Sequence, residues 1–216
     1  METSTPAATL FGLPMSIVGL LIAKSSLAEG NGPVAYLVPD KYLVDQVIAE
    51  ANKLGICVVN DPESFAYSQE SAILVDTFQK LFNGKSVFGV GGSVGRSPSV
   101  RLPNTVIIDD AHACLNKAEQ AFRLAIPSEH DAYNKLLTLF ESTLEDQSPA
   151  GFVALKAKLS SGVQQVPYWS WAEKQHEVIT TLLPLTTEGD YQFSWPLIAD
   201  ALSISRAVFT SDALEI

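Results

Sequence analysis

The stretch NTVIIDDAHAC, residues 104–114, is an apolar run that ends on two adjacent carboxylates. A run of Val and Ile without polar alternation is typical of a strand that is covered on both faces, as in a parallel sheet. From Ala111 the apolar spacing becomes helical, and we expect a helix from there through Phe122. Asp109 and Asp110 therefore follow directly on a predicted buried strand. Either the strand ends there in solvent, or the two acids belong to a site.

Three more short apolar runs precede this stretch and have the same character. The first is closed by prolines and is followed by a segment whose apolar residues recur at helical spacing up to a glycine. Repeated strand and helix units imply a parallel sheet with right-handed crossovers. We therefore predict an α/β fold, a parallel sheet with flanking helices. The predicted strands are PVAYLVP (33–39), ICVVN (56–60) and SAILVDTF (71–78), and the predicted helix is KYLVDQVIAEANKLG (41–55).

The pattern changes after residue 125. Three segments there have helical spacing and few strand signals, and they are 128–146, 150–162 and 170–183. A chain of 216 residues is long enough for one large α/β domain with a helical insertion. We predict a single domain over residues 1–216, with its core in 1–125 and a helical subregion in 126–205.

The overall charge limits the classes of partner. The formal net charge of -10 argues against a protein that coats nucleic acid through its overall field, because phosphate binding relies on Lys and Arg. Lys80, Lys85, Arg96 and Arg101 form either one local basic patch or part of a solvated loop. The glycine-rich segment GVGGSVGRS, 89–97, does not match the dinucleotide-binding pattern GxGxxG, because valine stands in the last glycine position.

Cysteine use and hydropathy indicate the compartment. Cys57 and Cys114 lie far apart in apolar contexts, so we predict two buried thiols in a reducing compartment, the cytoplasm. The apolar stretch LFGLPMSIVGLLIA, 10–23, is shorter than the roughly 20 residues that cross a bilayer. It also lacks the basic residues that precede the apolar part of a signal peptide. We expect a strand, a turn and a helix there, and no membrane partner.

Two other features each have a structural and a functional interpretation. PYWSW, 167–171, is either a packing plug between helix and sheet or an aromatic platform for a base, and its neighbours do not supply the positive charge of a nucleic-acid groove. His112, His130 and His176 leave a hydrolase triad as an alternative. The chain has no GxSxG elbow, so we do not expect a conventional hydrolase.

In a parallel sheet, Asp109 and Asp110 would lie near the polar residues that follow the other predicted strands. Open α/β sheets bind ligands beyond the carboxyl ends of their strands. The residues brought together there are Asp109 and Asp110, 39–41, and 76–79. A carboxylate on a rigid strand suits a hydrated magnesium ion, and a second acid can polarise water. A zinc site that adds His112 and Cys114 is the rival interpretation, and it is weaker because successive side chains of a strand point to opposite faces.

The sequence VIIDDAHA resembles the DEAD/DEAH motif of superfamily 2 helicases, in the spelling DDAH. The resemblance implies that Asp109 holds magnesium, that Asp110 helps to activate the attacking water, and that His112 couples the nucleotide site to the rest of the motor. It further implies the first motor domain of such a helicase, with RecA-like P-loop NTPase architecture and with ATP and Mg²⁺ as cofactors. The resemblance covers most of the chain from about residue 16 onward.

Two more segments resemble helicase segments that contact the nucleic-acid backbone. VAYLVPDKYLVDQV implies contacts from Pro39 and Lys41, and VDTFQKLFNG implies contacts from Thr77 and Gln79. FSWPLIADAL, 193–202, is similar to a stretch in a group of bacterial helicase-like proteins. The order and spacing of these segments carry the resemblance, because each segment is weak alone.

The phosphate-binding loop of such helicases, GxxxxGK[ST], is altered here. Alignment of the following helix puts FGLPMS, 11–16, in place of the loop. Gly12 then lies within it, Met15 occupies the lysine position and Ser16 remains as a magnesium ligand. Pro14 removes an amide donor, and Met15 replaces a cation by a neutral thioether. We therefore expect that this chain does not hydrolyse ATP by itself.

Two functions stay open. We find neither a SAT-like tripeptide after the acidic motif nor a second motor domain with its arginine finger. The chain is either an ATP- and nucleic-acid-binding motor domain that needs a second motor domain or a partner protein, or a pseudo-helicase that serves as a protein-interaction or regulatory module. The altered loop favours the second function, and the intact DDAH favours the first.

Overall fold

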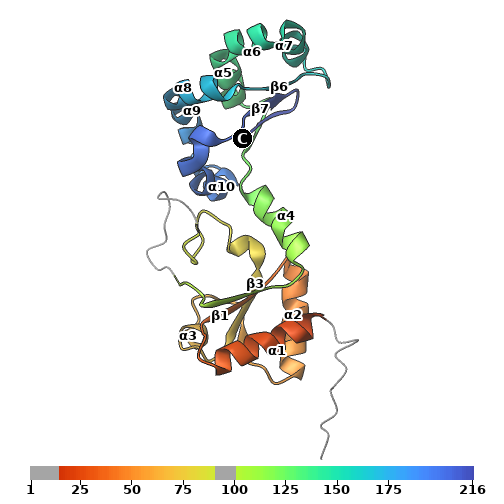
Figure 1. Ribbon diagram of the computed structural model, residues 1–216, viewed down its shortest axis with the longest axis vertical. Helices are drawn as coiled ribbons and strands as arrows, with labels where there is room; N and C mark the ends of the chain where they lie inside the picture. The colour runs from red at the N-terminus through yellow and green to blue at the C-terminus, as the bar shows by residue number, and fades with distance from the viewer. Residues whose placement is uncertain (1–14, 91–100) are drawn as a thin grey trace, which may run out of the picture. The chain divides into compact units, whose positions relative to one another are not determined.

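Figure 1 shows the computed structural model of the protein, which describes residues 15–90 and 101–216. These residues divide into two compact units. The parallel-sheet unit consists of residues 15–80 and 101–117, and the antiparallel-sheet unit consists of residues 81–90 and 118–216. The division predicted from the sequence, after residue 125, differs from this one because residues 81–90 and 118–125 belong to the second unit.

The parallel-sheet unit contains four strands in the order β2-β3-β1-β4, and all of them run in the same direction. The strands are β1 (Val34–Val38), β2 (Val58–Val59), β3 (Ile73–Thr77) and β4 (Thr105–Ile108). Every residue of β1 and β3 is buried, as expected for uninterrupted apolar runs in the middle of a sheet. The predicted α/β fold with a parallel sheet and flanking helices is confirmed.

Four helices accompany this sheet, and two of them follow the predicted bounds closely. The helices are α1 (Met15–Ala28), α2 (Lys41–Lys53), α3 (Phe65–Ser68) and α4 (Ala111–Ala121). A short 3-10 helix, η1 (Phe78–Lys80), follows β3. Helix α2 begins where the Asp40 carboxylate accepts a hydrogen bond of 3.0 Å from the Leu43 amide, and Gly55 follows it with a left-handed φ of 66°.

One face of the parallel sheet packs against α1 and α2. Alternate residues of β1, Val34, Tyr36 and Val38, point to this face and join Leu20 of α1 and Val47 of α2 in one buried cluster. Helix α1 contains residues 15–23 of the apolar stretch discussed above, and residues 10–14 lie outside the described residues. The predicted helix in this stretch is confirmed, and the predicted strand is not tested.

Strand β4 lies at one end of the sheet in the described part of the chain. Ile107 packs against the buried cluster, whereas Val106 and Ile108 are each 41% exposed. Parallel sheets normally bury both faces. The strand that leads into Asp109 and Asp110 therefore leaves apolar side chains in solvent.

The antiparallel-sheet unit contains a second sheet of four strands, in the order β5-β8-β7-β6. The strands are β5 (Ala125–Pro127), β6 (Val163–Gln165), β7 (Val208–Thr210) and β8 (Ala213–Glu215). The predicted helices of this region are present, but the antiparallel sheet was not predicted. Each strand has only three residues, and three residues are too few for an alternating pattern to stand out in the sequence.

The helices of this unit surround a core of their own. They are α5 (Asp131–Leu139), α6 (Glu141–Gln147), α7 (Pro149–Lys156), α8 (Tyr168–Glu173), α9 (Gln175–Leu182) and α10 (Tyr191–Ile198), with the 3-10 helices η2 (Leu183–Thr187) and η3 (Ala199–Ile204). Trp171 is buried at the centre of this core and stacks on Phe140, with ring centroids 5.6 Å apart. Its indole nitrogen donates a hydrogen bond of 2.7 Å to the Leu202 carbonyl. The packing interpretation of PYWSW is confirmed for Trp171.

The predicted burial of the two cysteines is confirmed for one of them. Cys114 is buried, as expected, but Cys57 is exposed, because it precedes β2, a strand of only two half-buried residues. Both thiols are free. Across residues 15–90 and 101–216, no helix is both long and apolar enough to span a bilayer.

Candidate functional site

The carboxyl ends of β3, β1 and β4 lie side by side at one edge of the parallel sheet, which we call the rim. Val38 of β1 pairs with Thr77 of β3, and Leu37 of β1 pairs with Ile108 of β4. The Asp109 amide extends this ladder with a hydrogen bond of 2.9 Å to the Leu37 carbonyl. The residues that were singled out after each of these strands therefore lie along the same edge.

Asp109 is held in place by Tyr36 of β1. The Tyr36 hydroxyl donates a hydrogen bond of 3.0 Å to Asp109 Oδ2. Burial of the tyrosine and the negative charge of Asp109 raise the Tyr36 pKa above its usual value, so the hydroxyl stays protonated and remains a donor. Gly19 of α1 leaves room for this ring, because a Cβ atom at that position would lie 2.5 Å from Tyr36 Cε2.

Ser16 in the first turn of α1 belongs to the same polar group. It is buried, and its hydroxyl donates a hydrogen bond to Glu50 Oε2 of α2. The charge of Glu50 also contributes to the raised pKa of Tyr36. A Cβ atom at Gly19, three residues after Ser16 on α1, would lie 2.8 Å from the Tyr36 hydroxyl oxygen, so α1 passes close to this hydroxyl. We call the two hydrogen-bonded pairs, Ser16–Glu50 and Tyr36–Asp109, together the Ser16–Asp109 polar chain.

Sequence reasoning found the two ends of this polar chain and missed its middle. Ser16 and Asp109 were both predicted as magnesium ligands. Tyr36 was read as one more apolar residue of a buried strand, and Glu50 as a polar residue of a helix. Glu50 lies near the end of α2, and nothing in the sequence around it indicates a partner. Only the packing of α2 against α1 brings Glu50 to Ser16.

The segment 11–16, which the resemblance aligns with a phosphate-binding loop, is described only in its last two residues. Met15 is 74% exposed, so its thioether neither packs into the core nor supplies a charge. Gly12 and Pro14 lie outside the described residues. The predicted role of the loop therefore rests on Met15 and Ser16 in the structure.

Asp110 is engaged at the start of α4. Its φ of 49° is left-handed, a conformation that aspartate adopts more readily than most residues. Its Oδ1 accepts a hydrogen bond of 3.1 Å from the Ala113 amide, so the carboxylate caps the helix. His112 is exposed, and it has no hydrogen bond or ion pair with the residues that the structure describes.

The zinc interpretation is not supported. Cys114 is buried, its Sγ donates to the Asp109 carbonyl at 3.3 Å, and burial together with the charges of Asp110 and Asp109 raises its pKa to about 11. A thiol that stays protonated at neutral pH is a poor zinc ligand. Within residues 15–90 and 101–216, no group of three or more His, Cys, Asp and Glu side chains is arranged to hold a metal ion.

The predicted nucleic-acid contacts at the rim differ in their access to solvent. Pro39 and Thr77 are buried, whereas Lys41 and Gln79 are exposed. Next to Thr77, the buried Asp76 accepts a hydrogen bond of 2.7 Å from the Thr77 amide through Oδ1. Of these four residues, only Lys41 and Gln79 therefore offer exposed side chains to a ligand.

The predicted basic patch is not assembled by the described residues. Lys80 Nζ lies 2.7 Å from Asp76 Oδ2 and forms an ion pair with it. Arg101 donates hydrogen bonds to the Pro62 carbonyl at 3.2 Å and to Ser68 Oγ at 2.6 Å, and these residues precede β3, at the end of the sheet opposite the rim. Lys85 belongs to the other unit, and Arg96 lies outside the described residues.

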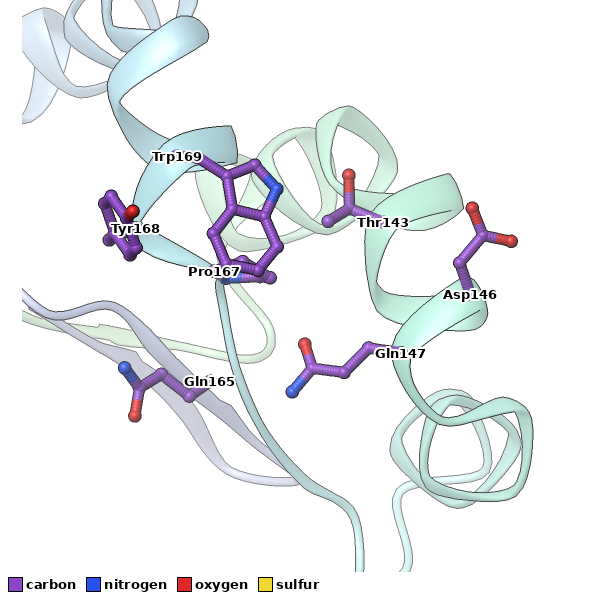
Figure 2. Close-up of a pocket in the computed structure, with 7 residues that line it drawn as sticks. All are labelled: Thr143, Asp146, Gln147, Gln165, Pro167, Tyr168 and Trp169. Carbon is purple, nitrogen blue, oxygen red and sulfur yellow. The ribbon is translucent and has the colours of Figure 1, made fainter.

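The antiparallel-sheet unit has a pocket of its own, with a volume of about 790 Å³. Figure 2 shows Trp169 projecting towards α6, and Gln147 pointing back from α6 into the same space. The lining residues are Thr143, Asp146, Gln147, Gln165, Pro167, Tyr168 and Trp169. The sequence singled out PYWSW but did not separate the buried Trp171 from the exposed Tyr168 and Trp169.

Comparisons with protein-family models, with curated proteins and with solved structures found no match to this chain. Arguments about function therefore depend on the residues of the chain itself.

Proposed function

We propose that the parallel-sheet unit is a helicase-like motor domain of RecA-like architecture, which binds Mg²⁺ and ATP at the rim but does not hydrolyse ATP by itself. The observation that carries this proposal is the Ser16–Asp109 polar chain. The resemblance names Ser16 and Asp109 as ligands of one ion, although they lie at opposite ends of the unit's sequence. Each belongs to a hydrogen-bonded pair, and α1 passes close to the Tyr36 hydroxyl that holds Asp109, which supports a shared site.

The oxygens of this group suit magnesium better than they suit a triphosphate. Hydroxyl and carboxylate oxygens are the ligands that Mg²⁺ prefers, and Ser16 and Asp109 would hold it. When bound, the ion would neutralise charge on the phosphates. The exposed Met15 adds no cation for them, and Lys80 is already paired with Asp76. Binding without turnover is therefore the expected behaviour.

The residues of the chain also limit the catalytic steps. Tyr36 orients Asp109 by donating to one of its oxygens and leaves Oδ1 for another ligand. Asp110 uses Oδ1 to cap α4, so its capacity to accept a proton from water is reduced. These two tasks support the expectation that a second motor domain or a partner protein completes the site.

A nucleic-acid strand along the rim would meet few charges. Lys41 and Gln79 are the exposed members of the predicted contact set, and only Lys41 is a cation. Binding to phosphates that depends on about one lysine has a shallow dependence on salt concentration and low affinity. We therefore expect weak nucleic-acid binding by the chain alone.

Titration calorimetry of the full chain with MgATP tests the proposal. The parent should bind, and Asp109→Ala should lose binding, whereas Asp45→Ala, an exposed acid on α2, should bind like the parent. Tyr36→Phe should bind more tightly if the tyrosine competes with the ion for Asp109. An Asp109→Ala variant that binds MgATP as well as the parent would contradict the proposed site.

The second candidate function is a pseudo-helicase that acts as a protein-interaction or regulatory module. The same polar chain favours it, because Ser16 and Asp109 already have partners inside the protein. In that case the parent and Tyr36→Phe should both fail to bind MgATP. Recovery of binding in Met15→Lys would then indicate a motor domain whose nucleotide function was lost at one loop.

A further inference from the structure

The pocket in the antiparallel-sheet unit presents two aromatic rings to solvent. Tyr168 is 77% exposed and Trp169 is 61% exposed. Their rings meet edge to face, with centroids 5.3 Å apart and an angle of 84° between the planes. Trp and Tyr side chains of this kind combine a large apolar surface with a polar tip, and they are enriched where proteins bind other molecules.

Hydrogen bonds and buried side chains hold together the elements that line the pocket. Gln164 of β6 is buried and donates hydrogen bonds to the Leu144 and Ser148 carbonyls, at 3.3 and 2.9 Å. This ties β6 to α6. Thr143 Oγ1 of α6 lies 3.1 Å from Ser170 Oγ of α8, and Trp171 anchors α8 in the core. The exposed rings therefore stand on a scaffold that is formed before any ligand arrives, as in most binding pockets.

The lining residues exclude an anionic ligand. The set contains Asp146 and no Lys, Arg or His. A nucleic-acid strand stacks on aromatic rings only where cations follow its backbone, and this pocket has none in its lining. The ligand is therefore neutral or carries positive charge.

Several polar groups of the pocket can donate hydrogen bonds, although the amides and the hydroxyl can also accept them and Asp146 only accepts. The Gln147 and Gln165 amides, the Thr143 hydroxyl and the Trp169 indole nitrogen all carry donor hydrogens. A fitting ligand would offer carbonyl acceptors next to flat apolar groups. A proline-rich peptide in the polyproline II conformation has both, because its carbonyls make no internal hydrogen bonds and its rings lie on the surface of an extended helix.

We propose that this pocket binds a proline-rich peptide with a flanking Lys or Arg. The peptide's proline rings pack against Trp169 and Tyr168, its carbonyls accept hydrogen bonds from Gln147 and the Trp169 indole nitrogen, and its cation pairs with Asp146. The peptide pays little conformational entropy on binding, since polyproline II is already formed in the free chain. This inference does not rest on the helicase-like proposal, because all the lining residues belong to the antiparallel-sheet unit.

Fluorescence anisotropy of a labelled peptide tests the inference on the full chain. The probe is a proline decamer with two arginines at one end. Trp169→Ala and Tyr168→Ala should each weaken binding at least about tenfold, as expected for aromatic residues at the centre of an interface. Tyr42→Ala is the matched control, because Tyr42 is also 77% exposed but lies on α2 of the other unit. It should bind like the parent.

Two further variants separate the contributions of the Trp169 indole donor and the Asp146 charge to peptide binding. Trp169→Phe keeps a ring without the indole donor, and it should lose less affinity than Trp169→Ala. Asp146→Asn should weaken the arginine-flanked decamer and leave a decamer without arginines unchanged.

Other results would overturn the inference. They are an absence of peptide binding by the parent, or equal binding by Trp169→Ala and the parent. Binding of a glucose hexamer or of a thymidine oligonucleotide in place of the peptide, lost in Trp169→Ala, would assign the pocket to another ligand class and also overturn it. Thermal unfolding of each variant confirms that it is folded.

Discussion

The two units of this protein reach a buried core by different means. In the parallel-sheet unit, β1 and β3 have five residues each and are buried along their whole length. In the antiparallel-sheet unit each strand has three residues, and large side chains such as Trp171, Phe140 and Phe209 fill the core between helices and sheet. Continuous apolar strands can be read from sequence, whereas a core assembled from single large side chains cannot.

The largest expected effect is on the antiparallel-sheet unit. Trp171→Ala removes a buried, stacked and hydrogen-bonded ring, which should lower the free energy of unfolding by about 3 to 5 kcal/mol. Trp169→Ala, at an exposed ring two residues earlier, should change it by less than about 0.5 kcal/mol. Urea unfolding followed by tryptophan fluorescence measures this, because all three tryptophans, at 169, 171 and 195, lie in this unit. Equal effects of the two substitutions would contradict a core centred on Trp171.

The next effect concerns the parallel-sheet unit. Gly19→Ala puts a Cβ atom 2.5 Å from Tyr36 Cε2, so the ring must move and its hydrogen bond to Asp109 must change. Overpacking of this kind costs about 1 to 3 kcal/mol. In a Cys57→Ser background, the loss appears as faster labelling of the buried Cys114 by a thiol reagent.

A second substitution identifies the cause of that loss. Tyr36→Leu removes the atoms that clash, so Gly19→Ala should cost much less in the Tyr36→Leu background than in the parent. Independent, additive costs would show that the glycine is needed for another reason.

A smaller effect distinguishes the helix cap that Asp110 makes from the negative charge of its side chain. Asp110→Ala removes the cap on the Ala113 amide and puts alanine at a left-handed φ of 49°, which should cost about 1 to 2 kcal/mol. Asp110→Asn keeps a capping oxygen and tolerates this backbone conformation, so it should stay within about 0.5 kcal/mol of the parent. Thermal unfolding measures both variants. An asparagine variant as unstable as the alanine variant would show that the charge, and not the cap, stabilises α4.

The smallest effect appears at high pH. Burial, helped by the charge of Asp109, raises the Tyr36 pKa, and burial raises that of Tyr67 to about 12. Below about pH 10 both the folded and the unfolded chain keep these phenol protons; above it, only the folded chain does. Stability should therefore fall as the pH rises above 10.

Tyr36→Phe is the variant that tests this dependence. It should reduce the loss of stability at high pH, as measured by urea unfolding at a series of pH values. An unchanged pH dependence in Tyr36→Phe would mean that other groups, such as Tyr67, account for the whole effect.

The sequence predicted the parallel-sheet unit because its signals are local. The bounds of α2 and α4 and the strands β1, β3 and β4 each follow from the apolar spacing of neighbouring residues. The rim also follows, since parallel strands end at the same edge. The interactions inside the rim do not follow, because the contact between Ser16 and Glu50 depends on how α1 packs against α2.

The strands of the antiparallel-sheet unit could not be predicted from the sequence for a related reason. Strands β7 and β8 form a local hairpin, but β5 pairs with β8 and β6 pairs with β7, so β5 and β6 have their partners far along the chain. Their pairing comes from tertiary packing and not from local preference. The pocket is equally non-local, since α6, β6 and α8 each contribute only a few of its residues. PYWSW alone could not indicate which of its rings would lie in solvent.

Strand β4 affects how the protein behaves at high concentration. An exposed apolar strand at the end of a sheet is a template on which strands of other molecules can assemble. Val106 and Ile108 give β4 this character, and the two carboxylates that follow it are the kind of flanking charge that keeps such strands from aggregating. We therefore expect the acidic pair to oppose such assembly, and variants that lack these charges should scatter more light as they are concentrated.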